Sequence, residues 1–537
     1  MEKKKPKGLV IVDNIKYKNN VVNIFLENNQ DMVKIGWAAL IAVSLSSFII
    51  SLDSTFMNVA ISNLVVDLNT TLSSIQLIIA VYALTMASLM LVGAKLQEVM
   101  GRKNTFIAGA VIFGIGTSIA TLSINSWMLL IGWSILEGAG AALMLPATAS
   151  IITGTYSGKN RTFALGIWTA MGGIASATGP LVGGILTTFI SWRLGFGIEF
   201  IIILIILALS KRLKYFPPSM KFSQLDKLGV LLSSFGIFLI VLGIFSINSY
   251  KNFDVPAFIS GIGILLLILF YFKEKQVINR EKRPLTDIRL LKNRNFLLGL
   301  LSRLVLSLAL AGAVFILPVF FQQERGANAF TTGLAILPLT LGVLIFSLIS
   351  SRLSNRIATH HLVSIGFFIA MLSSFFLSYQ FSLTTQIADI IPGTLILGMG
   401  LGLALPLTAN IILSSADPDK QSDASGIMST SISLGSSLGT AIIGIVLIFA
   451  TLNGLYAAYD HNYPNQFDKN HINQKLTVYE EKLTTTHEVL KSNQSSILYT
   501  VVNETVRNAM GIAFEFISFI FLISFIISLF IKPLKLK

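Results

Sequence analysis

Apolar residues dominate long blocks of this sequence, and short polar segments separate the blocks. Each block runs for roughly 18 to 27 residues, the length that an α-helix needs to cross a hydrocarbon core about 30 Å thick. Such a helix also satisfies its own backbone hydrogen bonds in lipid. We therefore predict about fourteen membrane-spanning helices. They are expected near residues 37–62, 75–97, 104–123, 127–152, 163–187, 193–210, 228–247, 256–273, 296–321, 331–351, 361–379, 387–413, 424–450 and 510–531.

Composition agrees with this pattern. Of the 537 residues, 53% are hydrophobic and only 12% are charged, and the mean hydropathy is +0.74. One soluble core could not bury so much apolar surface. The predicted fold class is therefore an all-α polytopic membrane protein.

The basic residues fall on alternate loops, which indicates how the chain is oriented. Arg193, Lys251 and Arg325 are the basic residues of the opposite short loops. By the positive-inside rule we expect both termini in the cytoplasm and an even number of spans. The net charge of +14 would suggest nucleic-acid binding in a soluble protein. Here the basic residues lie on the loops that the positive-inside rule places in the cytoplasm, so we expect no nucleic-acid partner. The lysine-rich residues 1–36 are interpreted as a cytoplasmic tail that precedes a retained first helix.

Two long polar segments interrupt the pattern. Residues 273–295 form a basic connector, and residues 451–509 form a mixed-charge segment that the orientation places outside. Apolar residues recur in the second segment near helical spacing, so we expect one or two amphipathic helices there. Two interpretations stay open: a solvated hairpin packed on the external rim, or a cap that gates the mouth or guides lipid-like cargo. The residues with that spacing are Leu476, Tyr479, Leu483, Leu490, Leu498, Val502 and Val506.

Carboxylates inside the predicted spans are the main candidates for chemistry. Asp53 lies roughly 24 Å along the first span, and Glu137 lies near the middle of the fourth. An ionisable group at such depth is costly unless it faces a cavity or a partner, and apolar surroundings favour its protonated form. We therefore expect both to carry protons. Glu199 and Glu515 are placed nearer the outer surface, where they either extend a proton relay or make local interfacial contacts.

Few other groups offer chemistry. All five histidines fall in loops or at a helix edge, so we expect no buried imidazole to shuttle protons. Arg303 either reaches back to the cytoplasm or neutralises an acid in the second half of the chain. The sequence has no cysteine, P-loop or HExxH pattern. We therefore expect no enzyme activity, no cofactor and no metal site.

Three segments give the chain a family resemblance. They are LDSTFMNVAI at 52–61, AKLQEVMGRK at 94–103 and GPLVGG at 179–184. Together they resemble the major facilitator superfamily, specifically its fourteen-span drug:proton antiporter branch. LEGAGAA at 136–142 is a partial match to the fourth-helix motif of the family.

The resemblance implies a fold and a set of site residues. It implies two six-helix bundles, at 37–210 and 296–537, joined by a linker at 211–295 that contains two extra spans, with alternating access between the bundles. It places Asp53 and Asn58 at characteristic polar positions of the branch. We expect proton coupling or substrate contact at these two residues and at Glu137 and Glu199, the latter two because they are acids within predicted spans. The resemblance assigns conformational roles to Glu98, Gly101, Arg102, Lys103, Gly179, Pro180, Gly183 and Gly184.

The chain also departs from the family pattern. An aspartate followed by arginine is replaced by Glu98 and Val99, and we expect Glu98 to pair with Arg102. The arginine expected on the fourth helix is Ser134, which puts conventional proton coupling in question.

These observations predict a secondary transporter in the cell membrane. The leading hypothesis is a proton-coupled exporter of hydrophobic or cationic drug-like compounds. The alternatives are an exporter of an endogenous lipid, fatty acid or metabolite, and a non-transporting receptor or scaffold. The expected partners are a small hydrophobic or amphipathic substrate, protons and membrane lipids, and the chain is expected to be a monomer.

Overall fold

The structure is a computed structural model. It describes residues 36–57, 60, 63–70, 72–246, 254–280, 284–327, 329–354, 356–417, 420–462 and 497–533. The predicted tail at 1–36 lies outside these residues except for Gly36, and so does Asn58. Every regular element within them is helical.

Fourteen of the described helices are long and apolar enough to cross a membrane, so the predicted number of spans is confirmed. The first is Gly36–Met57. The first half continues with α2 (Leu72–Met100), α3 (Arg102–Thr121), α4 (Ser126–Leu129), η1 (Leu130–Glu137), α5 (Gly138–Thr155), α6 (Gly158–Phe189) and α7 (Arg193–Ser210). Then come η2 (Phe222–Gln224), α8 (Lys227–Ser246), α9 (Asp254–Asn279) and η3 (Ile288–Lys292). The second half contains α10 (Arg294–Pro318), η4 (Val319–Glu324), α11 (Ala329–Leu353), α12 (Thr359–Leu377), α13 (Ile387–Ser414), α14 (Gln421–Asn462) and α16 (Ile497–Leu529).

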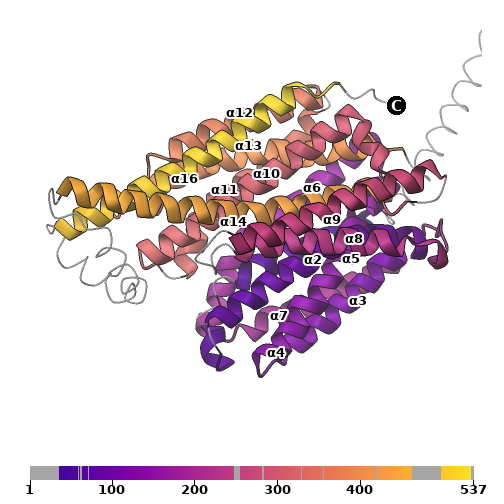
Figure 1. Cartoon of the computed structure of the whole chain (residues 1–537), viewed down its shortest axis with the longest axis horizontal. Coiled ribbons are helices and arrows are strands. Elements are labelled where there is room, and N and C mark those ends of the chain that lie inside the picture. The colour runs from indigo at the N-terminus through magenta and orange to yellow at the C-terminus, as the bar shows by residue number, and fades with distance from the viewer. Residues whose placement is uncertain are drawn as a thin grey trace, which may run out of the picture.

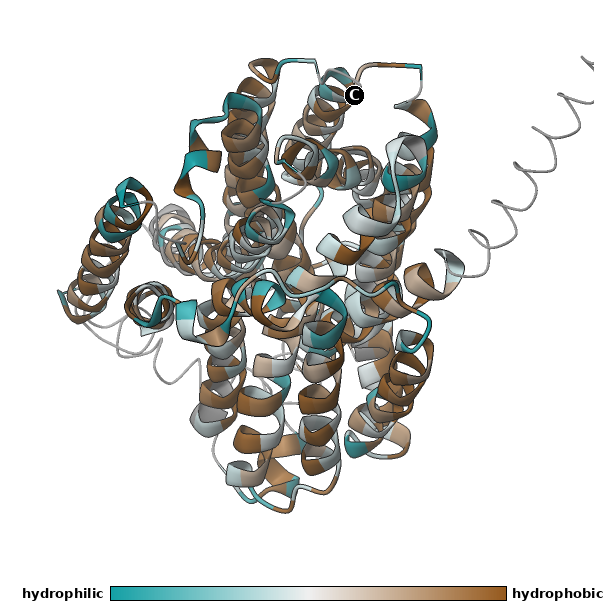
Figure 2. Ribbon diagram, turned by 90° about the vertical axis from the view of Figure 1, so that its right-hand side faces the viewer, coloured by the Kyte–Doolittle hydropathy of each residue, from teal (hydrophilic) through white to brown (hydrophobic). Residues whose placement is uncertain are grey.

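The helices form two bundles, one from each half of the chain (Figure 1). The bundles meet along α6 with α11 and along α2 with α14. The extra helices α8 and α9 pack on each other, and α8 also packs on α2. Hydrophobic residues cover the helix sides and hydrophilic residues gather toward helix ends (Figure 2), as expected for a protein whose solvent is lipid.

Glycines allow the closest helix crossings. A Cβ on Gly342 of α11 would lie 2.6 Å from the carbonyl oxygen of Leu395 on α13, and one on Gly402 would lie 2.6 Å from that of Val343. Such distances exclude any side chain, so the two backbones pack directly against each other. The glycine-rich segment at 398–406 is therefore a packing surface.

Residues 451–509 were predicted to hold separate external helices, but both ends of this segment belong to membrane helices. Helix α14 continues to Asn462, and α16 already begins at Ile497. Leu498, Val502 and Val506 thus belong to the last membrane helix, which corrects the expectation of an independent helix there. The two helices pack on each other, and Val506 is buried although hydropathy alone starts the last span after it. Leu476, Tyr479, Leu483 and Leu490 lie outside the described residues.

Candidate functional site: a buried carboxylate triad

Asp53 is completely buried in the first helix. Its Oδ1 accepts a hydrogen bond of 2.6 Å from Nε1 of Trp133, whereas its Oδ2 has no hydrogen-bond partner. Trp133 is itself stacked on Tyr82 of α2, with ring centroids 5.1 Å apart. The Tyr82 hydroxyl is buried near Asp53 without making a hydrogen bond of standard geometry. Trp133 and Tyr82 therefore pack beside the Asp53 carboxyl group and hold one of its oxygens in place.

Glu137 is the last residue of η1, a stretch of π-helix within the fourth span. Short π-helical turns frequently mark functional positions. Gly132 and Gly116 bring η1 against α3, since a Cβ on Gly116 would lie 2.6 Å from Cγ of Glu137. Ser134, where the resemblance led us to expect an arginine, donates a 2.6 Å hydrogen bond to the carbonyl oxygen of Ile78 on α2. The serine therefore ties η1 to α2 and adds no charge.

Glu199 lies on α7 and is also completely buried. The start of α7 is held by Arg193, which donates to the carbonyl oxygen of Ser123 at 2.9 and 3.1 Å. Phe196, one turn before Glu199, makes an edge contact with Trp133 at 6.3 Å. This anchoring directs Glu199 into the bundle interior.

One oxygen from each of Asp53, Glu137 and Glu199 lies within 4.8 Å of the others. We call these three residues the triad. Both carboxylate oxygens of Glu137 and of Glu199 are buried without a hydrogen-bond partner. No basic side chain within the described part of the chain forms an ion pair with any of them. Three uncompensated negative charges at such separations would be very costly in a low-dielectric interior, so the closed triad must hold protons or another cation.

The structure therefore changes the relative position expected for Glu199. It was placed nearer the surface, but it joins the other two acids in one cluster. Glu515 does not, because it is exposed on the outside of α16. Arg303 follows neither expected course: it is 5% exposed and donates a 2.6 Å hydrogen bond to the carbonyl oxygen of Leu405. No acid pairs with it among the described residues.

The segment 94–103 lies at the end of the bundles where the basic loops gather, which we call the basic end. The expected pair between Glu98 and Arg102 is not formed. Glu98 pairs with Lys95 at 2.9 Å instead, and Arg102 donates to the carbonyl oxygen of Ser150 at 2.8 Å while it stacks on Phe216. The aromatic ring and the carbonyl thus hold the guanidinium away from the carboxylate.

The two residues beside Arg102 also connect helices. Gly101 has φ +84° and its Cα faces the carbonyl oxygen of Phe216, a conformation and a space that suit only glycine. Lys103 donates to the carbonyl oxygens of Lys211 and Leu213 at 3.0 and 3.1 Å. A lysine there satisfies carbonyls left free at the end of α7.

The segment 179–184 lies within α6 and contacts the first helix. A Cβ on Gly179 would lie 3.3 Å from the carbonyl oxygen of Leu52 and would overlap the Thr55 hydroxyl. Pro180 follows in the same helix, and Gly183 and Gly184 are buried further along it. Because Leu52 and Thr55 are neighbours of Asp53 in the first helix, α6 approaches that helix closely beside Asp53.

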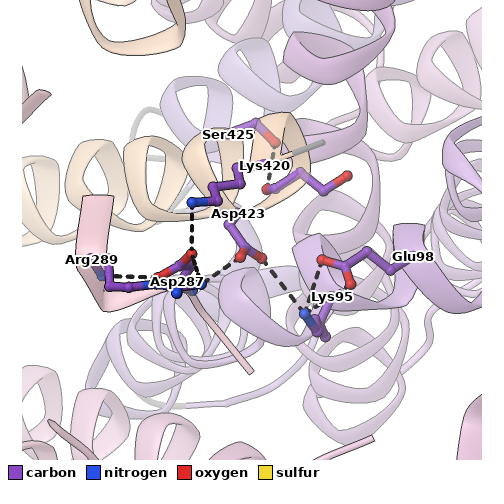
Figure 3. A network of polar contacts seen from close by, with 8 residues as sticks. Lys95, Glu98, Asp287, Arg289, Lys420, Asp423 and Ser425 are labelled. Atoms are coloured by element: carbon purple, nitrogen blue, oxygen red, sulfur yellow. Dashed lines mark hydrogen bonds and ion pairs between the residues drawn. The ribbon is translucent and has the colours of Figure 1, made fainter. Parts of the chain in front are cut away.

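A polar network links the bundles at the basic end (Figure 3). Nζ of Lys95 on α2 lies 3.8 Å from Oδ1 of Asp423 on α14. Oδ2 of Asp423 accepts a 3.0 Å hydrogen bond from the backbone N–H of Asp287 in the connector. The Asp287 carboxylate pairs with Arg289 at 2.8 Å and with Lys420 at 3.2 Å. The connector thus takes part in the contact between the two halves.

Sequence comparison identifies the family to which this architecture belongs. The family model described as Major Facilitator Superfamily matches residues 43–440. The chain belongs to this superfamily. Among curated members, the methylenomycin A resistance protein of Bacillus subtilis (strain 168) is 26% identical over 415 residues, which cover 77% of this chain and 88% of the relative. The probable multidrug resistance protein EmrY of Escherichia coli (strain K12) is 27% identical over 412 residues, covering 76% and 79%.

Solved structures of the superfamily show the same fold. The proton:xylose symporter XylE superposes with a TM-score of 0.57 over 93% of this chain and 97% of that one, at 11% identity. The predicted family and fold are therefore confirmed. Trp133, Tyr82, Lys95, Asp423 and Asp287 were not predicted as site residues, and only Lys95, a charge inside an apolar stretch, carried a signal in the sequence.

Proposed function

We propose that this chain is a proton-coupled exporter of small hydrophobic or cationic compounds that works by alternating access. The observation that carries the proposal is the triad, in which three buried carboxylates lack a counter-charge. Membership in a transporter superfamily supports it. So do relatives named for resistance to methylenomycin A and to methyl viologen.

The triad would couple transport through its changing exposure. Opened to the outside, the carboxylates would collect protons, and opened to the cytoplasm they would release them when a cationic substrate takes their place. A negative site of this kind attracts cations and repels anions in a low-dielectric environment. Cationic and zwitterionic amphiphiles are therefore the substrates that suit it best.

The remaining parts receive roles from their positions. The helices at 37–210 and 296–537 would rock as two units, with 211–295 as a linker between them. Glu98, Gly101, Arg102 and Lys103 would hold the closed basic end, while Gly179, Pro180, Gly183 and Gly184 would let α6 move along the first helix. The basic end would face the cytoplasm of a cell membrane with both termini there, and a monomer would suffice.

The test is dye efflux from cells that express the wild type, Asp53→Asn, Glu137→Gln or Glu199→Gln, with and without a proton uncoupler. We expect the wild type to expel an ethidium-type cation in an uncoupler-sensitive manner and each triad variant to lose this efflux. Glu274→Gln is the matched control, because Glu274 is a buried carboxylate on α9 that lies outside the triad. Efflux of the wild type that survives the uncoupler would refute proton coupling, and absence of efflux would instead favour a lipid or metabolite substrate.

A further inference from the structure

The dimensions of the triad fit one metal ion. Hard cations such as Ca²⁺ bind oxygen ligands at about 2.3–2.6 Å, so two oxygens on one ion are at most about 5 Å apart. The three carboxylate oxygens lie within 4.8 Å of one another. A single ion placed among them could therefore reach all three without a large movement of the backbone.

A fourth group points to the same place. The Tyr82 hydroxyl is buried beside Asp53 without a hydrogen bond of standard geometry, and it lies within electrostatic reach of all three acids. Tyr82 belongs to α2, which contributes none of the carboxylates. The lone pairs of this hydroxyl accept no hydrogen bond from any described residue, so the oxygen can bind an ion while its O–H turns toward Asp53.

The chemistry of the ligands restricts which ions are suitable. All four ligands are oxygens, and the chain has no cysteine, so hard cations are favoured over soft ones. No histidine contributes to the cluster, which makes zinc or copper a poor match. Among hard cations, Mg²⁺ holds its oxygens at about 2.0–2.1 Å, so two of them lie at most about 4.2 Å apart, and the spacing of up to 4.8 Å in the triad fits larger ions of the size of Na⁺ or Ca²⁺ better.

We propose that Asp53, Glu137, Glu199 and the Tyr82 hydroxyl form a binding site for one hard metal cation of the size of Na⁺ or Ca²⁺. The site is fully enclosed in this conformation, so an ion enters and leaves only when the bundles open. That the ion serves as a second coupling ion rests on the proposed transport function. Binding itself rests on the geometry alone.

Occupancy by metal displaces protons from the same oxygens. For an enclosed site to stay neutral, a monovalent ion replaces one proton and a divalent ion replaces two. The expectation of no metal site came from spacing along the sequence. It could not anticipate ligands contributed by four separate membrane spans.

The experiment is Tb³⁺ luminescence on the purified full-length protein in detergent. Tb³⁺ resembles Ca²⁺ in size and oxygen preference, and excitation of Trp133, which contacts Asp53 directly, should sensitise its emission. We expect saturable emission from the wild type that is lost on addition of excess Ca²⁺ or Na⁺. Displacement by Ca²⁺ alone would assign a divalent site, and displacement by Na⁺ as well would assign a site open to alkali ions.

Two variants make the result specific. Glu199→Gln keeps the side-chain volume and should weaken Tb³⁺ binding at least about tenfold, and Tyr82→Phe should weaken it by a smaller factor. Glu274→Gln should bind as the wild type does, and thermal unfolding of each variant shows that it is folded. Equal emission from wild type and Glu199→Gln, or no saturable emission from wild type, would overturn the proposal. Efflux without metal binding would leave the proposed function intact, whereas metal binding without efflux would refute that function and leave the cation site.

Discussion

The indole Nε1 of Trp133 donates a 2.6 Å hydrogen bond to Oδ1 of Asp53. The two residues are 80 positions apart in the chain and lie on the fourth and first spans. Trp133 therefore connects η1, which ends in Glu137, to the helix that carries Asp53. Such a hydrogen bond contributes about 0.5–1.5 kcal/mol when the carboxyl is protonated and about 1.5–3 kcal/mol when it is charged, so this contact helps to position the triad in either state.

Replacing Trp133 by phenylalanine should separate this positioning effect from packing. Trp133→Phe keeps an aromatic ring against Tyr82 but removes the donor. We expect proton-driven dye efflux to fall about tenfold or more, because about 1.4 kcal/mol corresponds to a factor of ten. The measurement is the initial efflux rate as a function of external pH. Trp192→Phe is the control, because Trp192 donates to Asp67 at 2.9 Å, outside the triad, and equal losses in both variants would mean that Trp133 acts only by packing.

Gly101 gives a prediction about stability. Gly101 has a φ of +84° and lies against the carbonyl oxygen of Phe216. Gly101→Ala should therefore lower the free energy of unfolding of the purified protein by about 1–3 kcal/mol and lower its melting temperature. Gly261→Ala is the matched control. Gly261 lies within α9 with open space around its Cα. Alanine there should leave the free energy of unfolding unchanged or raise it by about 0.5–1 kcal/mol. An unchanged melting temperature for Gly101→Ala would show that the segment 94–103 adapts without strain.

The network at the basic end predicts how firmly the two halves hold together. Asp423→Asn removes one charge from the pair with Lys95. The interaction energy between contacting residues is about 0.5–3 kcal/mol, so we expect the conformation in which the two bundles touch at the basic end to become several-fold less populated. The chain has no native cysteine, so Ser425→Cys introduces a single thiol at a buried position. Its maleimide labelling should speed up in the Asp423→Asn background. Labelling at Ser157→Cys, an exposed position, should stay the same, and parallel changes at both would point to general loosening of the fold.

Asp287 predicts a pH dependence of stability. Burial alone would raise the pKa of its carboxyl, but hydrogen bonds from Arg289 and the pair with Lys420 outweigh burial and lower that pKa. A carboxyl with a lowered pKa stabilises the folded state above its unfolded pKa of about 3.9 and loses this contribution as pH falls through the folded value. The wild type should therefore melt higher than Asp287→Asn near neutral pH, and the gap should close below about pH 4. A gap that stays constant from neutral pH to below about pH 4 would contradict this assignment.

The sequence was most informative where lipid imposes the constraint. The span predicted at 193–210 coincides with α7, Arg193–Ser210, because both of its ends are marked by polar residues. Helix α14 runs past its predicted end, and α16 begins before its predicted start, where Gly454 of α14 packs against Thr505 of α16. Hydropathy follows the lipid boundary, whereas a helix ends where its packing ends.

The candidate site was only partly predictable, for a geometric reason. Position along a span gives the depth of a side chain, so Asp53 and Glu137 were recognisable as buried acids. Depth does not give the direction in which a side chain points. For that reason Glu199 was predicted either to extend a proton relay nearer the outer surface or to make local contacts there, and its place in the same cluster could not be deduced. The π-helical turn at Leu130–Glu137 also changes the helical phase in a way that a regular period does not predict.

Helix α14 has a mechanical consequence. Its 42 residues form one continuous helix about 63 Å long, roughly twice the thickness of the hydrocarbon core. One end carries Asp423 at the contact between the bundles, and the other projects past the opposite end of the bundles beside α16 (Figure 1). A small tilt of the second bundle is thereby magnified into a larger sweep of this projecting tip. Any molecule that binds the projecting end of α14 would therefore act, through this continuous helix, on the contact between the bundles at Asp423.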